Sequence, residues 1–217
     1  MKKFKILLVF MVLGMAASAQ TLSVDDATVR VNETAAISID LMGGNGYVAS
    51  GFSVELPDGI VFTGDAIGGN ESSVVKTNLK NDNVMKIALY SNQNESFNNS
   101  KTNILSLEVI PSCKPGTYQG KISGIELATN SLALKKVTDV TFNIIVKNMY
   151  GDVNSDNKVT ITDAVGIVNH ILGNPLADFD KEAANVSGDI DEQGEPKITI
   201  TDAVGVLNII MNSGATE

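Results

Sequence analysis

Short apolar runs alternate with polar residues over the first two thirds of the chain. In residues 36–41 the apolar side chains recur at every second position, which places Ile37, Ile39 and Leu41 on one face of a β-strand. Clusters of Gly, Asn, Asp and Pro separate this run from its neighbours. The clearest runs are residues 28–31, 36–41, 52–56, 85–90, 104–109, 120–125 and 140–146. Strands at this spacing, with no helical stretch between them, predict an antiparallel β-sandwich over residues 20–148.

A different pattern begins after residue 148, because a segment with helical periodicity occurs there twice. Residues 160–172 (TITDAVGIVNHIL) recur as residues 199–211 (TITDAVGVLNIIM), with nine of thirteen positions identical. Such a repeat indicates a duplicated structural unit. The apolar positions that form one face of each predicted helix are Val165, Val168, Ile171 and Leu172, and Val204, Leu207, Ile210 and Met211. We therefore predict a small all-α domain of two loop–helix repeats over residues 149–217.

The first repeat is preceded by oxygen-bearing residues at regular spacing. Side chains at the first, third, fifth, ninth and twelfth places of a twelve-residue loop are Asp152, Asn154, Asp156, Thr160 and Asp163, and Lys158 offers its carbonyl at the seventh. This is the spacing of an EF-hand calcium loop, although Asn157 stands where Gly usually turns the chain and Asp163 replaces the final Glu. The competing interpretation is an acidic turn in which Asp163 stabilises a helix N-terminus without metal.

The loop before the second repeat is less regular. Asp189 and Asp191 fit the first and third places, and Thr199 and Asp202 fit the ninth and twelfth when the count runs back from the end. Two extra residues lie between them. The same count gives the carbonyl of Lys197 at the seventh place, and leaves Glu195 or Gln193 for the fifth. Together the loops predict a calcium-binding domain that holds two Ca²⁺ ions.

Charge and composition exclude several classes of function. The chain has 16 basic and 25 acidic residues, a net charge of -9, and so lacks the basic patch that nucleic acid binding requires. Twelve of the acids lie in residues 151–217, which supports a domain boundary near residue 150. A single Cys and a single His exclude Cys/His zinc sites and internal disulfides. Cys113 is expected to be a small buried hydrophobe.

No catalytic group of residues is evident. Glycosidases need two opposed carboxylates, and no such pair stands out beyond the calcium loops. His170 lies within a predicted helix and is expected at the surface, so a Ser or Cys nucleophile has no base. We therefore predict a protein that is not an enzyme. Sugar binding by the sandwich stays an alternative, although the chain has no Trp and only Tyr47 and Phe97 lie in loop-like sequence.

The first 19 residues have the organisation of a secretory signal peptide. Three lysines precede the apolar run 6–15, and small residues at Ala17 and Ala19 follow. The run is too short for a membrane span, which needs ~20 apolar residues. We expect cleavage after Ala19. Because three lysines are removed, the net charge changes from -9 to -12 in the mature chain. We expect the mature protein outside the cell, at its surface or in the periplasm.

The strand pattern of residues 29–41, 51–62 and 102–111 resembles a cohesin-type module. The resemblance implies a nine-stranded jelly-roll sandwich, related to some cellulose-binding modules, over residues 21–147. It also implies a binding role, either for a partner module or for polysaccharide.

Residues 150–163, together with 188–191 and 198–202, resemble a type I dockerin, and the match covers residues 150–212. The resemblance implies two calcium ions and, as partner, a cohesin-type module on another protein or on another copy of this chain. The partner-binding residues that it implies are Ile161, Thr162, Ile200 and Thr201. The alternative for Ile161 and Ile200 is that they pack inside the domain.

The sequence as a whole predicts an exported, noncatalytic adapter that docks to a partner in an extracellular or surface assembly. By resemblance, such assemblies serve polysaccharide breakdown. The alternative function is a secreted carbohydrate-binding protein that uses the sandwich to hold polysaccharide.

Overall fold

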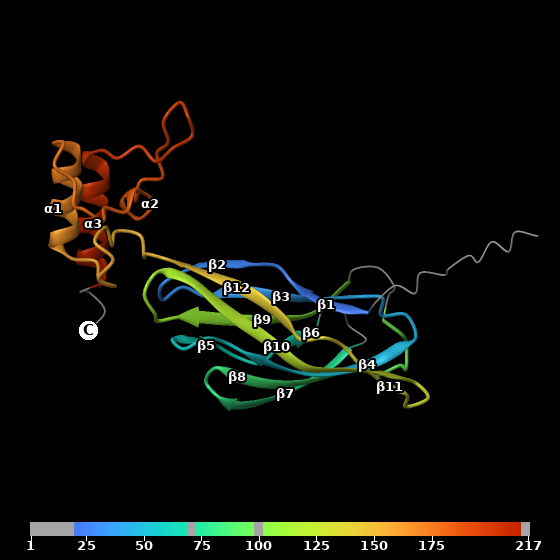
Figure 1. The fold of residues 1–217 in the computed structure, drawn as a ribbon. Helices are drawn as coiled ribbons and strands as arrows, with labels where there is room; N and C mark the ends of the chain where they lie inside the picture. Colours follow the sequence, from blue (N-terminus) through green and yellow to red (C-terminus); the bar gives the residue numbers. More distant parts are fainter. Residues whose placement is uncertain (1–19, 69–72, 98–101, 214–217) are drawn as a thin grey trace, which may run out of the picture.

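The computed structural model describes residues 20–68, 73–97 and 102–213. The predicted signal peptide, residues 1–19, lies outside these residues. Figure 1 shows an elongated β-sandwich with a small group of helices at one end. The last strand of the sandwich ends at Lys147, and the first helix begins at Ile161. No helix in the described part of the chain is both long and apolar enough to cross a membrane.

The sandwich consists of two sheets. The order in the smaller sheet is β1 (Thr21–Val24), β3 (Ala35–Met42), β9 (Thr102–Pro111) and β5 (Ile60–Phe62), and β6 (Ile67–Gly68) also pairs with β9. The order in the larger sheet is β2 (Ala27–Arg30), β12 (Val140–Lys147), β10 (Gly116–Thr129), β4 (Tyr47–Glu55), β8 (Val84–Ser91) and β7 (Ser73–Asn81), and β11 (Leu134–Lys136) also pairs with β10. The pairs are antiparallel except for β2 and β12, which run parallel. The predicted sandwich is confirmed.

The core lies between the two sheets and follows the alternation of the sequence. Ile37, Ile39 and Leu41 on β3 are buried, as predicted, and face buried residues of β4, β8 and β10 across the sandwich. Phe97, expected in an exposed loop, is buried against the same core, and its amide donates to the carbonyl of Tyr47. A large aromatic side chain at the edge of an open sheet gains more from covering the core than from solvent.

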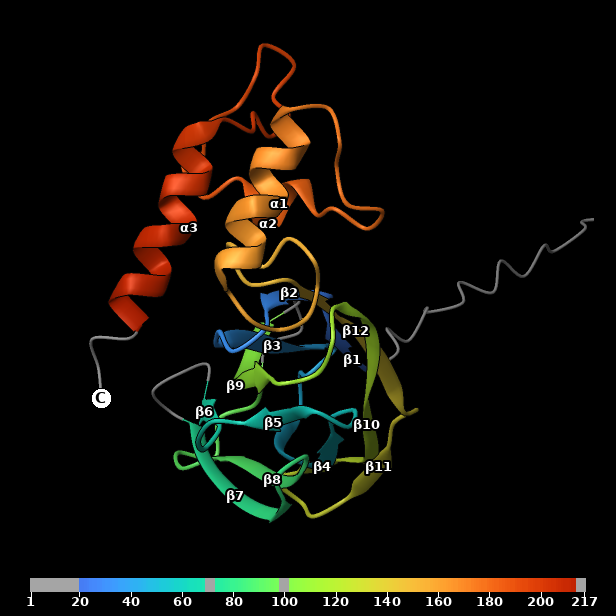
Figure 2. The same cartoon turned by 90° about the vertical axis from the view of Figure 1, so that its left-hand side faces the viewer.

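The helical unit contains α1 (Ile161–Ile171), the short α2 (Lys181–Ala184) and α3 (Ile200–Ser213). Helices α1 and α3 lie side by side and run in opposite directions (Figure 2). The three helices and the first loop share a small core of their own: Val153, Ala164, Ile167, Ala184, Ala203 and Val206. Of the apolar face expected from the repeat, Val168 and Ile210 pack against this core, whereas Val165, Ile171, Leu172, Val204, Leu207 and Met211 are exposed.

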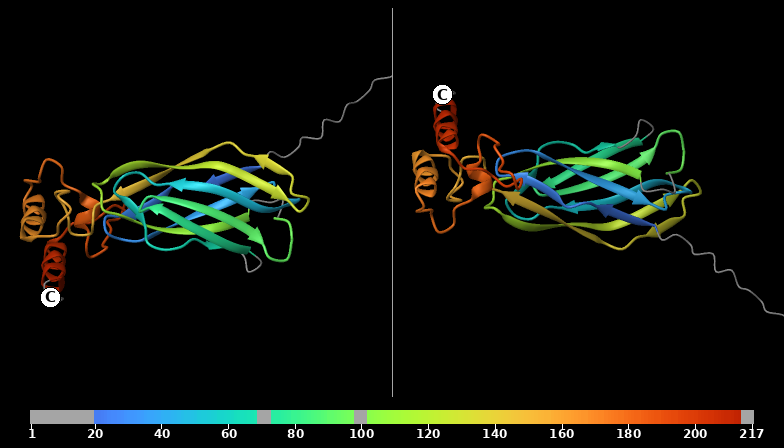
Figure 3. Two further views of the ribbon diagram at one scale, coloured as in Figure 1. Left: turned by 90° about the horizontal axis from the view of Figure 1, so that it is seen from below. Right: turned by 90° about the horizontal axis from the view of Figure 1, so that it is seen from above.

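Two cations from the sandwich meet one acid of α2 at the junction between the two parts. The guanidinium group of Arg30 donates to Oε1 of Glu182 at 2.9 Å and to the carbonyl of Asn148 at 2.6 Å. Lys147 also contacts Glu182, at 2.8 Å. The amide of Gly151, in the linker between β12 and α1, donates a hydrogen bond to the carbonyl of Ala183 on α2. The helical unit is thus held at the end of the sandwich where β2 and β12 finish (Figure 3).

Candidate functional site

The larger sheet turns one face away from the core, and this outer face is built on neighbouring strands. On β4, Phe52 and Val54 are buried, so Ser53 between them points outward; on β8 the same argument places Lys86 and Ala88 outward. The register sets outward residues opposite one another across three strands. Ser53 pairs with Lys86, Gly51 with Ala88, Asn78 with Lys86, and Lys76 with Ala88. We call Gly51, Ser53, Lys76, Asn78, Lys86 and Ala88 the sheet face.

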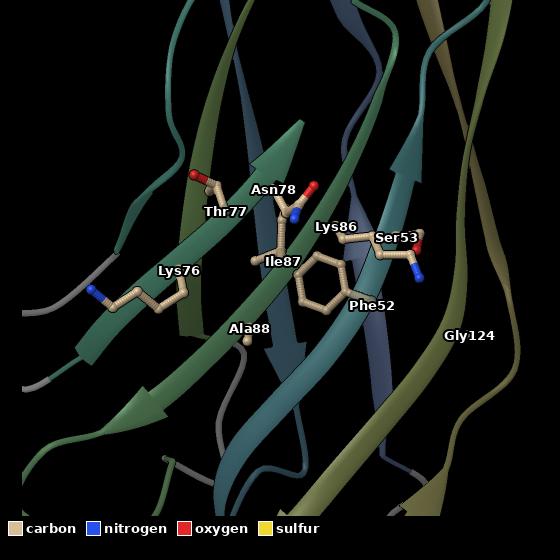
Figure 4. Close-up of a pocket in the computed structure, with 9 residues that line it drawn as sticks. All are labelled: Phe52, Ser53, Lys76, Thr77, Asn78, Lys86, Ile87, Ala88 and Gly124. Carbon is tan, nitrogen blue, oxygen red and sulfur yellow. The ribbon is translucent and has the colours of Figure 1, made fainter. Parts of the chain in front are cut away.

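A hollow of about 410 Å³ lies on the sheet face (Figure 4). Its lining comes from β4, β7, β8 and β10: Phe52, Ser53, Lys76, Thr77, Asn78, Lys86, Ile87, Ala88 and Gly124. Gly124 has φ +63° and sits where β10 shifts register against β4, between Ser123 and Glu126. A bulge at a glycine bends the strand locally and adds no side chain above the sheet. The hollow is therefore open and shallow rather than enclosed.

Small side chains occupy the middle of the sheet face, and charged side chains flank it. Lys76 and Lys86 form no ion pair with any residue that the structure describes. Elsewhere on β10, Lys121 lies 2.9 Å from Asp139, and this hydrogen-bonded carboxylate raises the pKa of the Lys121 amine. The sheet face therefore carries two positive charges without an ion-pair partner among the described residues, although the chain as a whole is acidic. They lie beside a flat centre, where a partner's backbone can approach closely.

The first predicted calcium loop is tightly curled. Ser155 and Asn157 have φ of +60° and +64°, which turns the chain back on itself. The carboxylate of Asp152 is fully buried and accepts hydrogen bonds from the amides of Asp156 (3.2 Å) and Asn157 (2.9 Å). Burial raises the pKa of Asp152, and the negative charges of Asp163 and Asp156 raise it further. A buried acid without a cation beside it is costly, and a bound cation would remove that cost.

Asp163 and Asp202 begin their helices in the same way. Asp163 is buried, accepts from the amides of Val153 (3.0 Å) and Thr160 (2.8 Å), and forms a capping box with Thr160. Asp202 accepts from Ser187 and Thr199. Burial acts to raise the pKa of Asp202, but these hydrogen bonds lower it overall. Both acids therefore stabilise helix N-termini, as the competing interpretation of the acidic turns requires.

The second loop has a different register from the predicted one. In the first loop Val153 lies against Gly166, and in the second Val186 lies against the equivalent Gly205. This match makes Asn185, Ser187 and Asp189 the first, third and fifth residues of the second loop. Two further observations agree with it.

One agreement is the backbone turn at the fourth place, where Ser155 and Gly188 both have positive φ, +60° and +76°. The other is the hydrogen bond from the fifth amide to the third side chain, from Asp156 to Asn154 (3.1 Å) and from Asp189 to Ser187 (3.3 Å). The extra residues form a hairpin, closed by the bridge between Ile190 and Pro196, that holds the predicted ligands Asp191 and Glu195. Asp191 and Glu195 therefore lie in this insertion, whereas Lys197 keeps its place two residues before Thr199.

Across the described residues, no group of three or more His, Cys, Asp or Glu side chains is arranged to hold a metal ion. The carboxylates of the first loop are occupied by backbone amides instead. Its donor set, with Asn154, Lys158 and Thr160 beside three acids, consists of the oxygen ligands that Ca²⁺ prefers. The second loop offers a poorer set.

An apolar groove of about 270 Å³ runs between α1 and α3. It is lined by four pairs of equivalent residues from the two repeats: Ile161 and Ile200, Ala164 and Ala203, Val165 and Val204, and Val168 and Leu207. Ile161 is 61% exposed and Ile200 62%, which excludes the alternative that they pack inside. Thr162 and Thr201 are exposed in the first turns of the same helices.

His170 and Cys113 lie differently from expectation. The ring of His170 stacks on Phe179 with 4.3 Å between centroids and is half-buried rather than on the surface. Cys113 is half-buried and packs at the margin of the sandwich core.

Solved structures similar to this chain are cohesin modules. A cohesin module of a family 33 glycoside hydrolase from Clostridium perfringens has a TM-score of 0.53 and 11% identity, over 60% of this chain and 96% of that one. A non-cellulosomal cohesin from the archaeon Archaeoglobus fulgidus gives 0.50 and 12%, over 59% and 92%. The sandwich has the cohesin fold. A chain of a type I cohesin–dockerin complex from Clostridium thermocellum gives 0.50 and 14%, over 59% and 99%. No family model and no curated protein matches this chain.

These similarities correct two sequence-based predictions. The assignment of residues 150–212 to the type I dockerin family is wrong: the structural similarity is to cohesin modules over about the first 60% of the chain, and nothing shows a dockerin. The structure supports only a few helices there. The predicted partner, a cohesin-type module on another protein or another copy, is also wrong, because it has the opposite role from the one that a cohesin-like fold implies.

Proposed function

We propose that this protein is an exported, noncatalytic docking module whose cohesin-like sandwich binds a dockerin-type partner through the sheet face. The cohesin fold carries the proposal, since the solved cohesins that resemble this chain include one in complex with a dockerin. The leader, residues 1–19, is the basis for export. Assembly outside the cell, in complexes that act on polysaccharide, fits both features.

The sheet face has the form that a helical partner needs. Gly51, Ser53 and Ala88 leave the centre low, and a helix about 10 Å across can lie over it without displacing any large side chain. Lys76 and Lys86 can then pair with acids on that helix at the rim, where such pairs raise the rate and specificity of docking.

A binding measurement with two matched arginine variants tests this proposal. Ala88→Arg places a long side chain in the centre of the sheet face, whereas Ser38→Arg places it on β3, on the outer side of the other sheet. Against a panel of purified dockerin modules, isothermal titration should find a partner that Ala88→Arg weakens at least tenfold and Ser38→Arg leaves unchanged. Equal loss in both variants, or binding that Ala88→Arg does not affect, would contradict the use of the sheet face.

We also propose that the first loop of the helical unit binds one Ca²⁺. Asp152, Asn154, Asp156, Thr160 and Asp163, with the carbonyl of Lys158, would hold it. The ion would neutralise a buried carboxylate and stabilise the folded state alone. The second loop would bind more weakly, because Asn185 and Ser187 stand where the first loop has Asp152 and Asn154 and so remove one charge.

The alternative of sugar binding has no support from the aromatic side chains. Phe97 is buried, and the exposed Tyr150 ring is covered on one side by Arg30. Tyr90 is exposed on β8, but no second aromatic ring among the described residues packs beside it to form a flat sugar-binding surface. A flat pyranose-binding surface needs such rings. The docking function is therefore the one proposed.

A further inference from the structure

The groove between α1 and α3 leaves large apolar side chains exposed, although the helical unit has only a small apolar core. Val165 is 51% exposed and Val204 49%, in addition to the two isoleucines at the helix starts. Met211 extends the same helix surface and is exposed. Soluble proteins seldom expose a contiguous patch of this kind unless another surface covers it. None of these residues belongs to the small core beneath.

The charge of this surface selects the kind of partner. Residues 151–217 carry twelve acids and three lysines, yet α1 and α3 contain only the acids Asp163 and Asp202, both fully buried. The groove is therefore neutral inside a strongly acidic unit. A charged partner would find no complementary group there, whereas a second neutral apolar surface could approach without a charge being desolvated.

The groove is also built to match a copy of itself. Each residue on its α1 side has its repeat equivalent on the α3 side, and the helices run in opposite directions (Figure 2). A twofold dimer requires a self-complementary patch, in which each residue meets its counterpart across the axis. When two such grooves face each other, α1 of one copy can lie against α1 or α3 of the other with the same residues in contact.

We propose that two copies of this chain pair through the groove, so that α1 and α3 of both form a four-helix bundle. The pairing would cover the exposed parts of Ile161, Val165, Ile200, Val204 and Met211 on each copy. The pairing is independent of the sheet face, which lies on the sandwich. A dimer of this kind presents two sandwiches, each free to dock.

Sedimentation equilibrium of the purified chain over a hundredfold range of concentration tests the proposal. The chain should reach twice its monomer mass, and Ile161→Asp with Ile200→Asp should raise the dissociation constant at least tenfold. Ile190→Asp is the control, because Ile190 is 65% exposed in the same unit but lies on the hairpin outside the groove. A monomer at every concentration, or a dimer that the double variant leaves unchanged, overturns the proposal.

A cross-linking variant guards against loss of folding in the aspartate variants. Val165→Cys with Cys113→Ser puts the single thiol in the groove, and under mild oxidation the chain should form a disulfide-linked dimer. The same thiol at Ile190 should not. Ala88→Arg should leave dimerisation intact, so failure of docking and failure of pairing give different results.

Discussion

The guanidinium carbon of Arg30 lies 3.7 Å from the centre of the Tyr150 ring, and the same group reaches Glu182 on α2. One buried side chain of the sandwich therefore contacts both the linker and the helical unit. Asn148 extends the connection, since its amide donates to Ser155 in the first loop (2.8 Å) and to Asp180 at the start of α2 (2.7 Å). The helical unit is joined to the sandwich by side chains as well as by the chain itself.

Replacing Arg30 should loosen this junction. We expect Arg30→Ala to lower the free energy of unfolding by about 2 kcal/mol, because it leaves the carbonyl of Asn148 and the stacked face of Tyr150 without their partner. Thermal unfolding measures the loss, and small-angle scattering should show a broader distribution of distances between the two parts. Lys136→Ala is the control: this exposed lysine lies 3.8 Å from Glu126 and should contribute almost nothing. Equal effects of the two changes would contradict the role of Arg30.

Acid should weaken the contact between the β1–β2 turn and β12. Hydrogen bonds from the backbone and side chain of Asn143 lower the pKa of Asp26 below its ordinary 3.8. An acid with a lowered pKa stabilises the fold above its unfolded pKa, and this contribution is lost as pH falls through the folded value. The unfolding free energies of the wild type and Asp26→Asn should therefore differ at pH 6 and converge near pH 2. A difference that stays constant with pH would exclude this ionisation as its cause.

A neutral residue in place of Asp152 should reduce the response of the protein to calcium. Without metal, Asp152→Asn removes a buried charge that has no cation beside it but also one of the two oxygens that accept the amides of Asp156 and Asn157, so the melting temperature should change by only a few degrees. With millimolar Ca²⁺ the wild type should gain stability and the variant should gain much less. Differential scanning calorimetry in EDTA and in Ca²⁺ gives both values. Asp191→Asn, in the hairpin of the second loop, should change neither; a wild-type chain that Ca²⁺ does not stabilise would refute the calcium proposal.

The register of the second loop can be tested by a double-mutant cycle. A β-carbon on Gly205 would come within 2.8 Å of a methyl group of Val186, as one on Gly166 would come within 2.9 Å of Val153. Gly205→Ala should therefore cost about 1–3 kcal/mol by overpacking, and Val186→Ala should relieve part of that cost. Chemical denaturation measures the coupling. Additive effects would mean that the two residues are not in contact, and that Asn185 is not the first residue of the loop.

Period-two alternation was enough to predict the sandwich, because each strand has one face in the core and one in solvent. Ile37, Ile39 and Leu41 show this directly. The sequence could not predict the pairing of β2 with β12, which depends on two segments more than a hundred residues apart. Nor could it locate the sheet face, whose residues carry no chemical signal until three strands bring them together.

In the helical unit the sequence repeat was evident, but the face of each helix that is buried could not be predicted in full. Helical periodicity puts Ala164 and Val165 on adjacent faces, and the larger side chain was expected inside. The close approach of α1 and α3 instead selects the smaller residue for the core and leaves Val165 in the groove. The register of the second loop was predicted wrongly for another reason. The residues inserted before Thr199 contain acids at calcium spacing, while Asn185 and Ser187, which are equivalent to Asp152 and Asn154 of the first loop, are neutral.

The place of β12 in the larger sheet has a consequence for the order in which the chain can fold. β12 lies between β2 and β10, so the strand that begins at Ala27 has no partner in its sheet until residues 140–147 have been synthesised. A sheet in which an early strand, β2, pairs with the last strand, β12, cannot be completed before the C-terminal part of the sandwich has left the ribosome. The nascent chain thus stays open through most of its synthesis, and Arg30 meets Asn148, Tyr150 and Glu182 only after the last strand has been made.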